Sequence, residues 1–145
     1  MPGSLIIALD AMGGDFGPEV VVPGASISAV RHPQISFLMF GDEARIRPLV
    51  DKDPKLAGRV EIIHTTQTIA MDAKPSHAIR RGKGSSMWLA LEAVREGRAA
   101  VAVSAGNTGA LMALYRLLLK PLGDIERPAI AAIWPTVRAE SLVLD

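Results

Sequence analysis

The chain has 145 residues, of which 49% are hydrophobic and 21% are charged, so it can form a sizeable core and is not disordered. Sixteen basic and fifteen acidic residues give a formal net charge of +1, which argues against a nucleic-acid partner. The lack of cysteine excludes disulfides, thiolate nucleophiles and zinc–cysteine sites. No apolar run reaches roughly 20 residues and no signal-peptide pattern is visible, so the sequence predicts a cytoplasmic protein.

Short apolar runs with little alternation are typical of strands covered on both faces. Such runs predict strands over residues 5–9, 35–40, 60–64 and 99–103. Helical spacing or capping residues predict helices over residues 18–31, 43–51, 76–81, 85–96 and 107–120. Strands that alternate with helices favour right-handed βαβ units, so we predict an α/β fold: a three-layer, mainly parallel open sheet with helices on both faces.

Two further apolar runs, residues 129–134 and 141–144, predict a hairpin joined through Pro135 and Thr136. Residues 141–145 are also typical of a buried strand that ends on an acid, as residues 5–10 do. A natural domain seldom stops within a buried strand. We therefore expect residues 1–145 to be the N-terminal part of a single, longer α/β domain, with part of the active site beyond Asp145.

The loop "DAMGGDFG", residues 10–17, follows the first predicted strand. Asp10 lies at the carboxyl end of that strand, where ligands of parallel sheets bind. Gly13 and Gly14 let a ligand approach the backbone, and the next helix, with Pro18 at its start, offers amides to an anion. The same residues also fit a plain strand-to-helix turn in which Asp15 bonds local amides.

The loop "SAGNTG", residues 104–109, has the same context, since it follows the fourth predicted strand and precedes a helix. Its amides, the hydroxyls of Ser104 and Thr108 and the amide of Asn107 suit a phosphate or a carbonyl oxygen, while Gly106 and Gly109 leave room. The alternative is ordinary helix capping by Asn107 or Thr108.

Basic side chains gather in residues 74–86 of an otherwise neutral chain. Lys74, His77, Arg80, Arg81 and Lys83 can reach into a cleft and bind phosphate, or they can form a solvated helix face. The glycines of residues 82–86 lack the spacing of a P-loop.

Three segments in this order, "LDAMGGDFGPE", "KPSHAIRRGKGSSM" and "VSAGNTGALMA", closely resemble the bacterial phosphate acyltransferase family PlsX. The resemblance spans residues 5–145 and includes Arg127, Pro128 and Ala129 before the fifth strand. Members of the family are much longer, so it covers their N-terminal part. It implies an open α/β sheet like that of isocitrate and isopropylmalate dehydrogenases or of phosphotransacetylases.

The resemblance also implies a reaction in which inorganic phosphate attacks the thioester of an acyl-acyl carrier protein, giving acyl phosphate for phospholipid synthesis. Phosphate is partly dianionic near neutral pH and the leaving thiol has an ordinary pKa of about 8.5, so neither a cysteine nor a strong base is needed. Positioning and charge stabilisation suffice.

On this basis we predict a catalytic group of Asn107 and Thr108, which contact the oxyanion or phosphate, and Asp10, which shapes the cleft or polarises a proton. The predicted phosphate- and substrate-binding residues are Gly13, Gly14, Asp15, Lys74, His77, Arg80, Arg81, Lys83, Ser104, Gly106 and Gly109. We expect the two loops to face each other across one anion-binding cleft, with Arg80, Arg81 and Lys83 at its rim. A basic side chain or a metal should neutralise Asp10 and Asp15, although no metal site and no cofactor is assigned.

The resemblance implies a homodimer, which the apolar segment 110–119 also favours. Its expected partners are acyl-acyl carrier protein, inorganic phosphate and a membrane glycerol-3-phosphate acyltransferase, with peripheral contact at the membrane.

Two alternatives stay open. One is a nicotinamide-dependent dehydrogenase, with Asp42 as a ribose-binding acid, although Met12 would then occupy the first glycine of the GxGxxG fingerprint. The other is a non-catalytic dimerisation or carrier-binding fragment.

Overall fold

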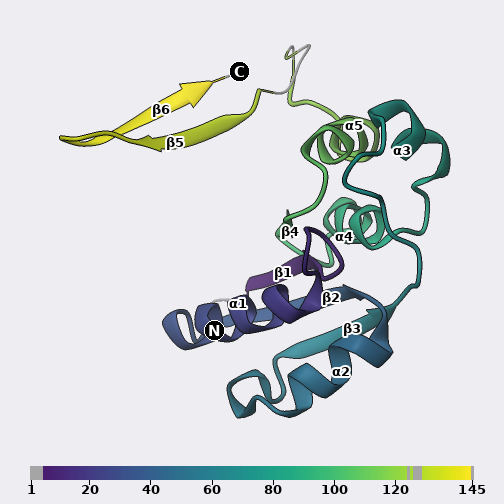
Figure 1. The fold of residues 1–145 in the computed structure, drawn as a ribbon, viewed down its shortest axis with the longest axis vertical. Coiled ribbons are helices and arrows are strands. Elements are labelled where there is room, and N and C mark those ends of the chain that lie inside the picture. Colours follow the sequence, from purple (N-terminus) through teal and green to yellow (C-terminus); the bar gives the residue numbers. More distant parts are fainter. Residues whose placement is uncertain (1–4, 124, 126–128, 145) are drawn as a thin grey trace.

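The protein folds around a four-stranded parallel sheet in the computed structural model, which describes residues 5–123, 125 and 129–144 (Figure 1). The strands lie in the order β3-β2-β1-β4. Their bounds are β1 Leu5–Asp10, β2 Ile35–Gly41, β3 Val60–His64 and β4 Val101–Ser104. Every neighbouring pair in this sheet is parallel, which confirms the predicted α/β fold.

Proline and capping residues set the starts of the helices. The helices are α1 Pro18–Arg31, α2 Glu43–Asp51, α3 Pro75–Arg81, α4 Ser86–Arg95 and α5 Thr108–Leu118, with the short 3-10 helix η1 Pro54–Leu56. Ser85 and Asn107, predicted as first helical residues, are instead N-caps whose side chains accept hydrogen bonds from backbone amides of α4 and α5. Among the described helices, none is long and apolar enough to cross a lipid bilayer.

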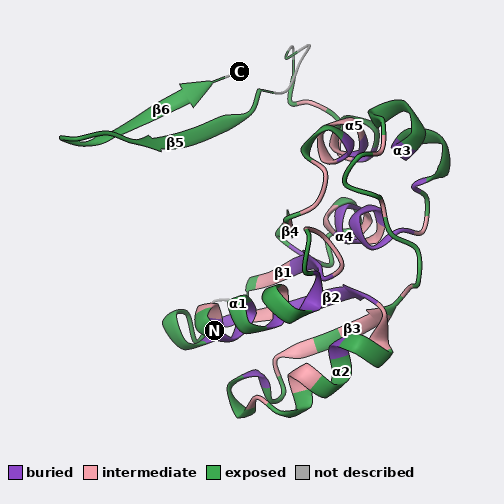
Figure 2. Ribbon diagram, in the orientation of Figure 1, coloured by how far each residue is buried: buried purple, intermediate pink, exposed green. Residues whose placement is uncertain are grey.

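Alternate strand residues point to opposite faces of the sheet, and both faces are covered. On one face, Leu9, Phe37 and Met39 pack in a core with α1 and α2. On the other face, Leu38 and Phe40 pack with alanines of α4. Figure 2 shows buried residues along β2 and on the inner side of α4. This confirms the predicted three layers.

A third core cluster joins α3, α4 and α5 beyond the sheet. Trp88 and Met87 of α4 pack there with Ala78 of α3 and with Leu114 and Leu118 of α5. Figure 1 shows α3 and α5 side by side. This cluster fixes the start of α5 relative to the basic segment.

Several boundaries differ from the sequence prediction by one or two residues, and one short helix was not predicted. The fourth strand begins at Val101 instead of residue 99, because the amide of Ala99 donates to the carbonyl of Ala93 near the end of α4. Helix η1 was not predicted; Asp53 caps it by accepting a bond from the Lys55 amide.

The last two strands, β5 Ala131–Pro135 and β6 Glu140–Leu144, form the predicted antiparallel hairpin. The prediction that the final strand is buried was wrong, since every residue of β5 and β6 is exposed. The hairpin extends away from the helices and the main sheet (Figure 1), so neither of its faces meets a core. Arg127, Pro128 and Asp145 lie outside the described residues.

Candidate functional site

The two predicted loops lie at the same edge of the sheet. Strands β1 and β4 are parallel neighbours, and Asp10 is in register with Ser104 at their carboxyl ends. The loops of residues 10–17 and 104–109 therefore leave the sheet side by side, as predicted.

A direct hydrogen bond joins the loops. The Ser104 hydroxyl donates to Oδ2 of Asp10 at 2.7 Å, and the Gly106 amide donates to the same hydroxyl oxygen at 3.0 Å. The other carboxylate oxygen of Asp10 accepts from the Met12 amide at 3.3 Å. Asp10 is only 2% exposed, so these donors take the place of water.

Among the described residues, no basic side chain forms an ion pair with Asp10 or Asp15, so the expected cation beside them stays a prediction. The part of the chain that the structure describes also contains no group of three or more acidic or histidine side chains that could hold a metal ion. Neutral donors, a hydroxyl and an amide, satisfy the buried carboxylate.

The two loops are in direct contact, so no cleft lies between them at this point, and the open space lies beside them. A Cβ atom at Gly13 would lie 2.8 Å from both Oδ2 of Asp10 and the Gly106 amide nitrogen, and Gly14 has a φ of +83°. The adjoining open space is a cavity of about 240 Å³, which we call the glycine-loop cavity. Its lining includes Gly13, Gly14, Asp15, Phe16, Val20 and Met71, with Ala105 from the second loop.

Asn107 binds protein groups with both ends of its side-chain amide. Its oxygen accepts from the Ala110 amide at 3.0 Å and so caps α5. Its nitrogen donates to the carbonyls of Met71 and Ala73, each at 2.8 Å, and lies 3.4 Å from that of Ala70. Asn107 thus ties the start of α5 to the segment that precedes α3. Its predicted contact with an oxyanion requires these bonds to be exchanged.

The start of α5 also adjoins the start of α3. A Cβ atom at Gly109 would lie 3.2 Å from Cγ of Pro75, so this glycine permits the close approach of the two helices. Thr108 and Gly109 are exposed in the first turn of α5, where unpaired amides carry positive partial charge. Lys74 immediately precedes Pro75, which brings the basic segment to this point.

The other basic residues continue along α3, farther from the loops. Lys74, His77, Arg80 and Arg81 line a cavity of about 380 Å³ together with Ser76, which we call the α3 cavity. All four basic side chains are exposed, and none forms an ion pair with another described residue. Lys83 is exposed in the turn after α3.

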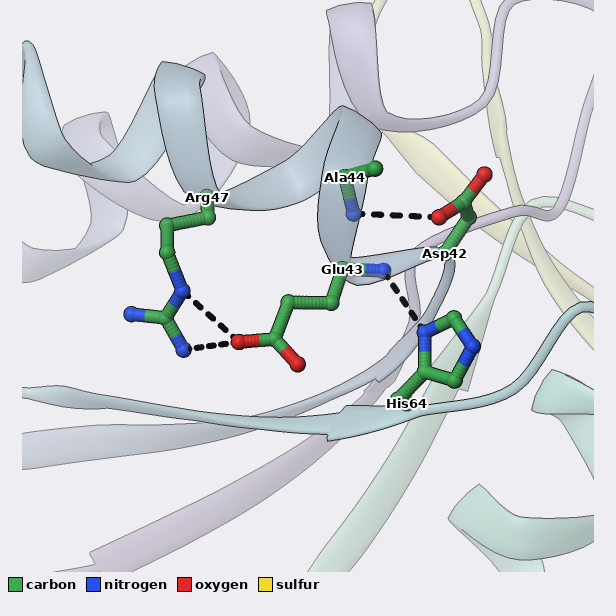
Figure 3. Close-up of polar contacts among 5 residues, drawn as sticks. All are labelled: Asp42, Glu43, Ala44, Arg47 and His64. Carbon is green, nitrogen blue, oxygen red and sulfur yellow. Dashed lines mark hydrogen bonds and ion pairs between the residues drawn. The ribbon is translucent and has the colours of Figure 1, made fainter.

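A separate polar network closes the carboxyl ends of β2 and β3 (Figure 3). Asp42 accepts from the Ala44 amide at 3.0 Å, and Nδ1 of His64 accepts from the Glu43 amide at 3.1 Å. Asp42 is therefore the cap of α2. The side chain of Met12 packs against Gly41, since a Cβ atom added to Gly41 would lie 2.6 Å from Cγ of Met12. Met12 stands where the dinucleotide-binding fingerprint has its first glycine, so its side chain occupies space that the fingerprint leaves free.

Sequence reasoning missed the role of residues 70–73 and the apolar side chains of the glycine-loop cavity. The carbonyls that hold Asn107 carry no side-chain signature, and residues 65–74 form no regular element. Phe16 directly follows the glycine loop's Asp15 in the sequence and was the visible signal, whereas Met71 lies more than fifty positions away.

A parallel sheet covered on both faces, with two strand-to-helix loops meeting at its carboxyl edge, is typical of the class of α/β proteins that bind ligands at that edge. The family model described as "Fatty acid synthesis protein" matches residues 5–145, and the chain belongs to that family. This confirms the resemblance to the PlsX phosphate acyltransferases.

Many similar curated proteins carry the name phosphate acyltransferase, among them the following three. The chain is 57% identical over 146 residues to the protein of Parvibaculum lavamentivorans, covering 100% of this chain and 40% of that relative. Identity to the protein of Afipia carboxidovorans is 62%, covering 96% and 40% of the two chains. Identity to a Rhodopseudomonas palustris protein is 61%, covering 100% and 42%. The chain thus spans about two fifths of these relatives.

Proposed function

We propose that the complete gene product containing this sequence moves a fatty acyl group from acyl-acyl carrier protein to inorganic phosphate, which gives acyl phosphate for phospholipid synthesis. The observation that carries the proposal is the 57–62% identity, over 96–100% of the chain, to proteins named phosphate acyltransferase. The two loops at the sheet edge support it with a polar, amide-rich site.

In this reaction an oxygen of the phosphate dianion attacks the thioester carbonyl and forms a tetrahedral oxyanion. The carbon–sulfur bond then breaks, and the proton carried by the phosphate ends on the carrier thiol. The exposed first turn of α5, with Thr108 and Gly109, offers hydroxyl and amide donors to the oxyanion or the phosphate. The Asn107 amide, which was predicted to contact the oxyanion, binds the carbonyls of residues 71 and 73 instead and holds the start of α5 beside them.

The remaining predicted residues take two roles in the proposal. Asp10 orients the Ser104 hydroxyl and keeps the loops in contact through Gly13 and Gly106. The basic residues of the α3 cavity, with Lys83 beside them, bind phosphate or the phosphopantetheine phosphate of the carrier protein. Gly14 and Asp15 border the glycine-loop cavity, where substrate would approach the backbone.

The proposal extends to partners and location. A second copy of the chain forms a homodimer, and the protein acts in the cytoplasm. Acyl phosphate is an activated donor, so an acyltransferase that acylates glycerol 3-phosphate at the membrane would consume it, and contact with that enzyme places the protein peripherally at the membrane.

The experiment is to incubate the complete gene product with acyl-acyl carrier protein and phosphate and to follow free carrier thiol with a thiol-reactive dye. Residues 1–145 contain no cysteine, and a sample without acyl donor gives the thiol background of the other residues. We expect thiol release that depends on phosphate, with an equal amount of labelled phosphate incorporated into acyl phosphate. Thiol release without phosphate, or none at all, contradicts the proposal. Residues 1–145 alone should turn over far more slowly, because the relatives are much longer; equal turnover contradicts that expectation.

A further inference from the structure

The glycine-loop cavity has an apolar wall at a polar site. Phe16 is 70% exposed, Val20 is 57% exposed and Met71 is 48% exposed, and they come from the loop, from α1 and from the segment before α3. Single exposed apolar residues are common, but here three separate segments bring them to one cavity of about 240 Å³. Such a wall favours a ligand with an apolar part.

The cavity adjoins the residues proposed for the reaction. Gly13, which lines it, would touch Asp10 and Gly106 if it carried a Cβ atom, and Ala105 lines it from the second loop. A group bound against Met71 therefore lies beside Ala105, in the loop that leads to α5. The cavity is too small for a whole long acyl chain and suits its first methylene groups.

Asn107 holds Met71 in this wall. Its amide nitrogen donates at 2.8 Å to the backbone carbonyls of Met71 and Ala73, two residues apart in a segment without regular structure. The bond from the Ala73 amide to the Ala70 carbonyl, 3.1 Å, closes the turn between them. The side chain at position 107 thus sets where the Met71 backbone lies.

We propose that the glycine-loop cavity binds the thioester-proximal methylene groups of the acyl donor, and that Asn107 is a positioning residue that holds its Met71 wall. The inference rests on the proposed acyltransfer. It assigns an apolar ligand to a cavity that the phosphate and the basic residues do not need. Each buried methylene group strengthens binding about fourfold, so the apolar wall favours the acyl-loaded carrier protein over the carrier protein without an acyl group.

The chain offers a matched pair of variants. Val20 and Val30 lie on the same helix and are each 57% exposed, but only Val20 lines the cavity. In the complete gene product, V20S should lower kcat/KM for the acyl donor about tenfold, for short-chain and long-chain donors alike, because the first methylene groups are common to both. V30S should leave it unchanged, and the KM for phosphate should stay the same in both. Equal effects of the two substitutions overturn the cavity assignment.

Asn107→Ser tests the positioning role. Serine caps a helix about as well as asparagine but is too short to reach residues 71 and 73. We expect the KM for the acyl donor to rise about tenfold, with kcat and the KM for phosphate within twofold of wild type. M71S should have the same effect, and the double variant should be no worse than either single one. A lower kcat with an unchanged KM for the donor overturns the positioning role and makes Asn107 the oxyanion donor. Lack of phosphate-dependent turnover in the wild-type protein overturns the proposed function and this inference with it.

Discussion

Gly13 lies where the two loops of the site touch, and its surroundings leave no room for a methyl group. A Cβ atom there would come within 2.8 Å of Asp10 and of the Gly106 backbone. We expect Gly13→Ala to lower the free energy of unfolding by about 1–3 kcal/mol, because the loops must separate to admit it. Urea denaturation followed by circular dichroism measures the change.

Gly24 provides the control for this substitution. It lies inside α1, and no other atom comes within 4 Å of the position of an added Cβ. Gly24→Ala should therefore raise the free energy of unfolding by about 0.5–1 kcal/mol, since alanine favours a helix. If Gly13→Ala proves as favourable as Gly24→Ala, the close contact of the loops is not present in solution.

At the scale of elements, an ion pair links α1 to α2 at the end of the glycine loop. Nη2 of Arg45 donates to Oε1 and Oε2 of Glu19 at 3.0 Å and 2.8 Å. This hydrogen bond lowers the pKa of Glu19 below its ordinary value of 4.5. The stabilisation is complete above that ordinary value and is lost as the pH falls through the lowered pKa of the folded protein. Both side chains are exposed, so the pair contributes little to stability.

The expected result is a change in titration. Carbon-13 NMR of the carboxyl groups should show the pKa of Glu19 below its ordinary value in the wild-type protein and closer to that value in Arg45→Gln. Asp53 is the internal control, because the Ser26 hydroxyl and the Lys55 amide lower its pKa without Arg45. An unchanged titration of Glu19 in the variant would mean that the ion pair does not form.

Local patterns predicted most elements, since continuous apolar runs mark strands buried on both faces, and Pro18 and Pro75 mark helix starts. The meeting of Asp10 with Ser104 was also predictable, because parallel strands end at one edge. Contacts between segments that lie far apart in the sequence were not predictable. The bonds from Asn107 to residues 71 and 73 span more than thirty positions, and the exposed β6 has the apolar pattern of a buried strand.

At the scale of the whole molecule, the chain leaves much apolar surface uncovered. A cavity of about 620 Å³ beside β4 is lined by Ala102, Leu111, Met112 and Tyr115, and Leu117 of α5 is exposed. A second copy of the chain, as in the homodimer proposed above, would cover such surface. Light scattering of the complete gene product at micromolar concentration should give twice the mass of one chain. The mass of a single chain under those conditions would contradict the homodimer.

The exposed hairpin places one of the two tryptophans in water and leaves the other in the core. Trp134 of β5 is 64% exposed, whereas Trp88 of α4 is 9% exposed. Their fluorescence therefore reports on two different events. Any surface that covers the hairpin shifts the emission of Trp134 to shorter wavelength and shields it from acrylamide. Emission from Trp88 responds instead when the packing of α3, α4 and α5 is lost, so one spectrum separates assembly from unfolding.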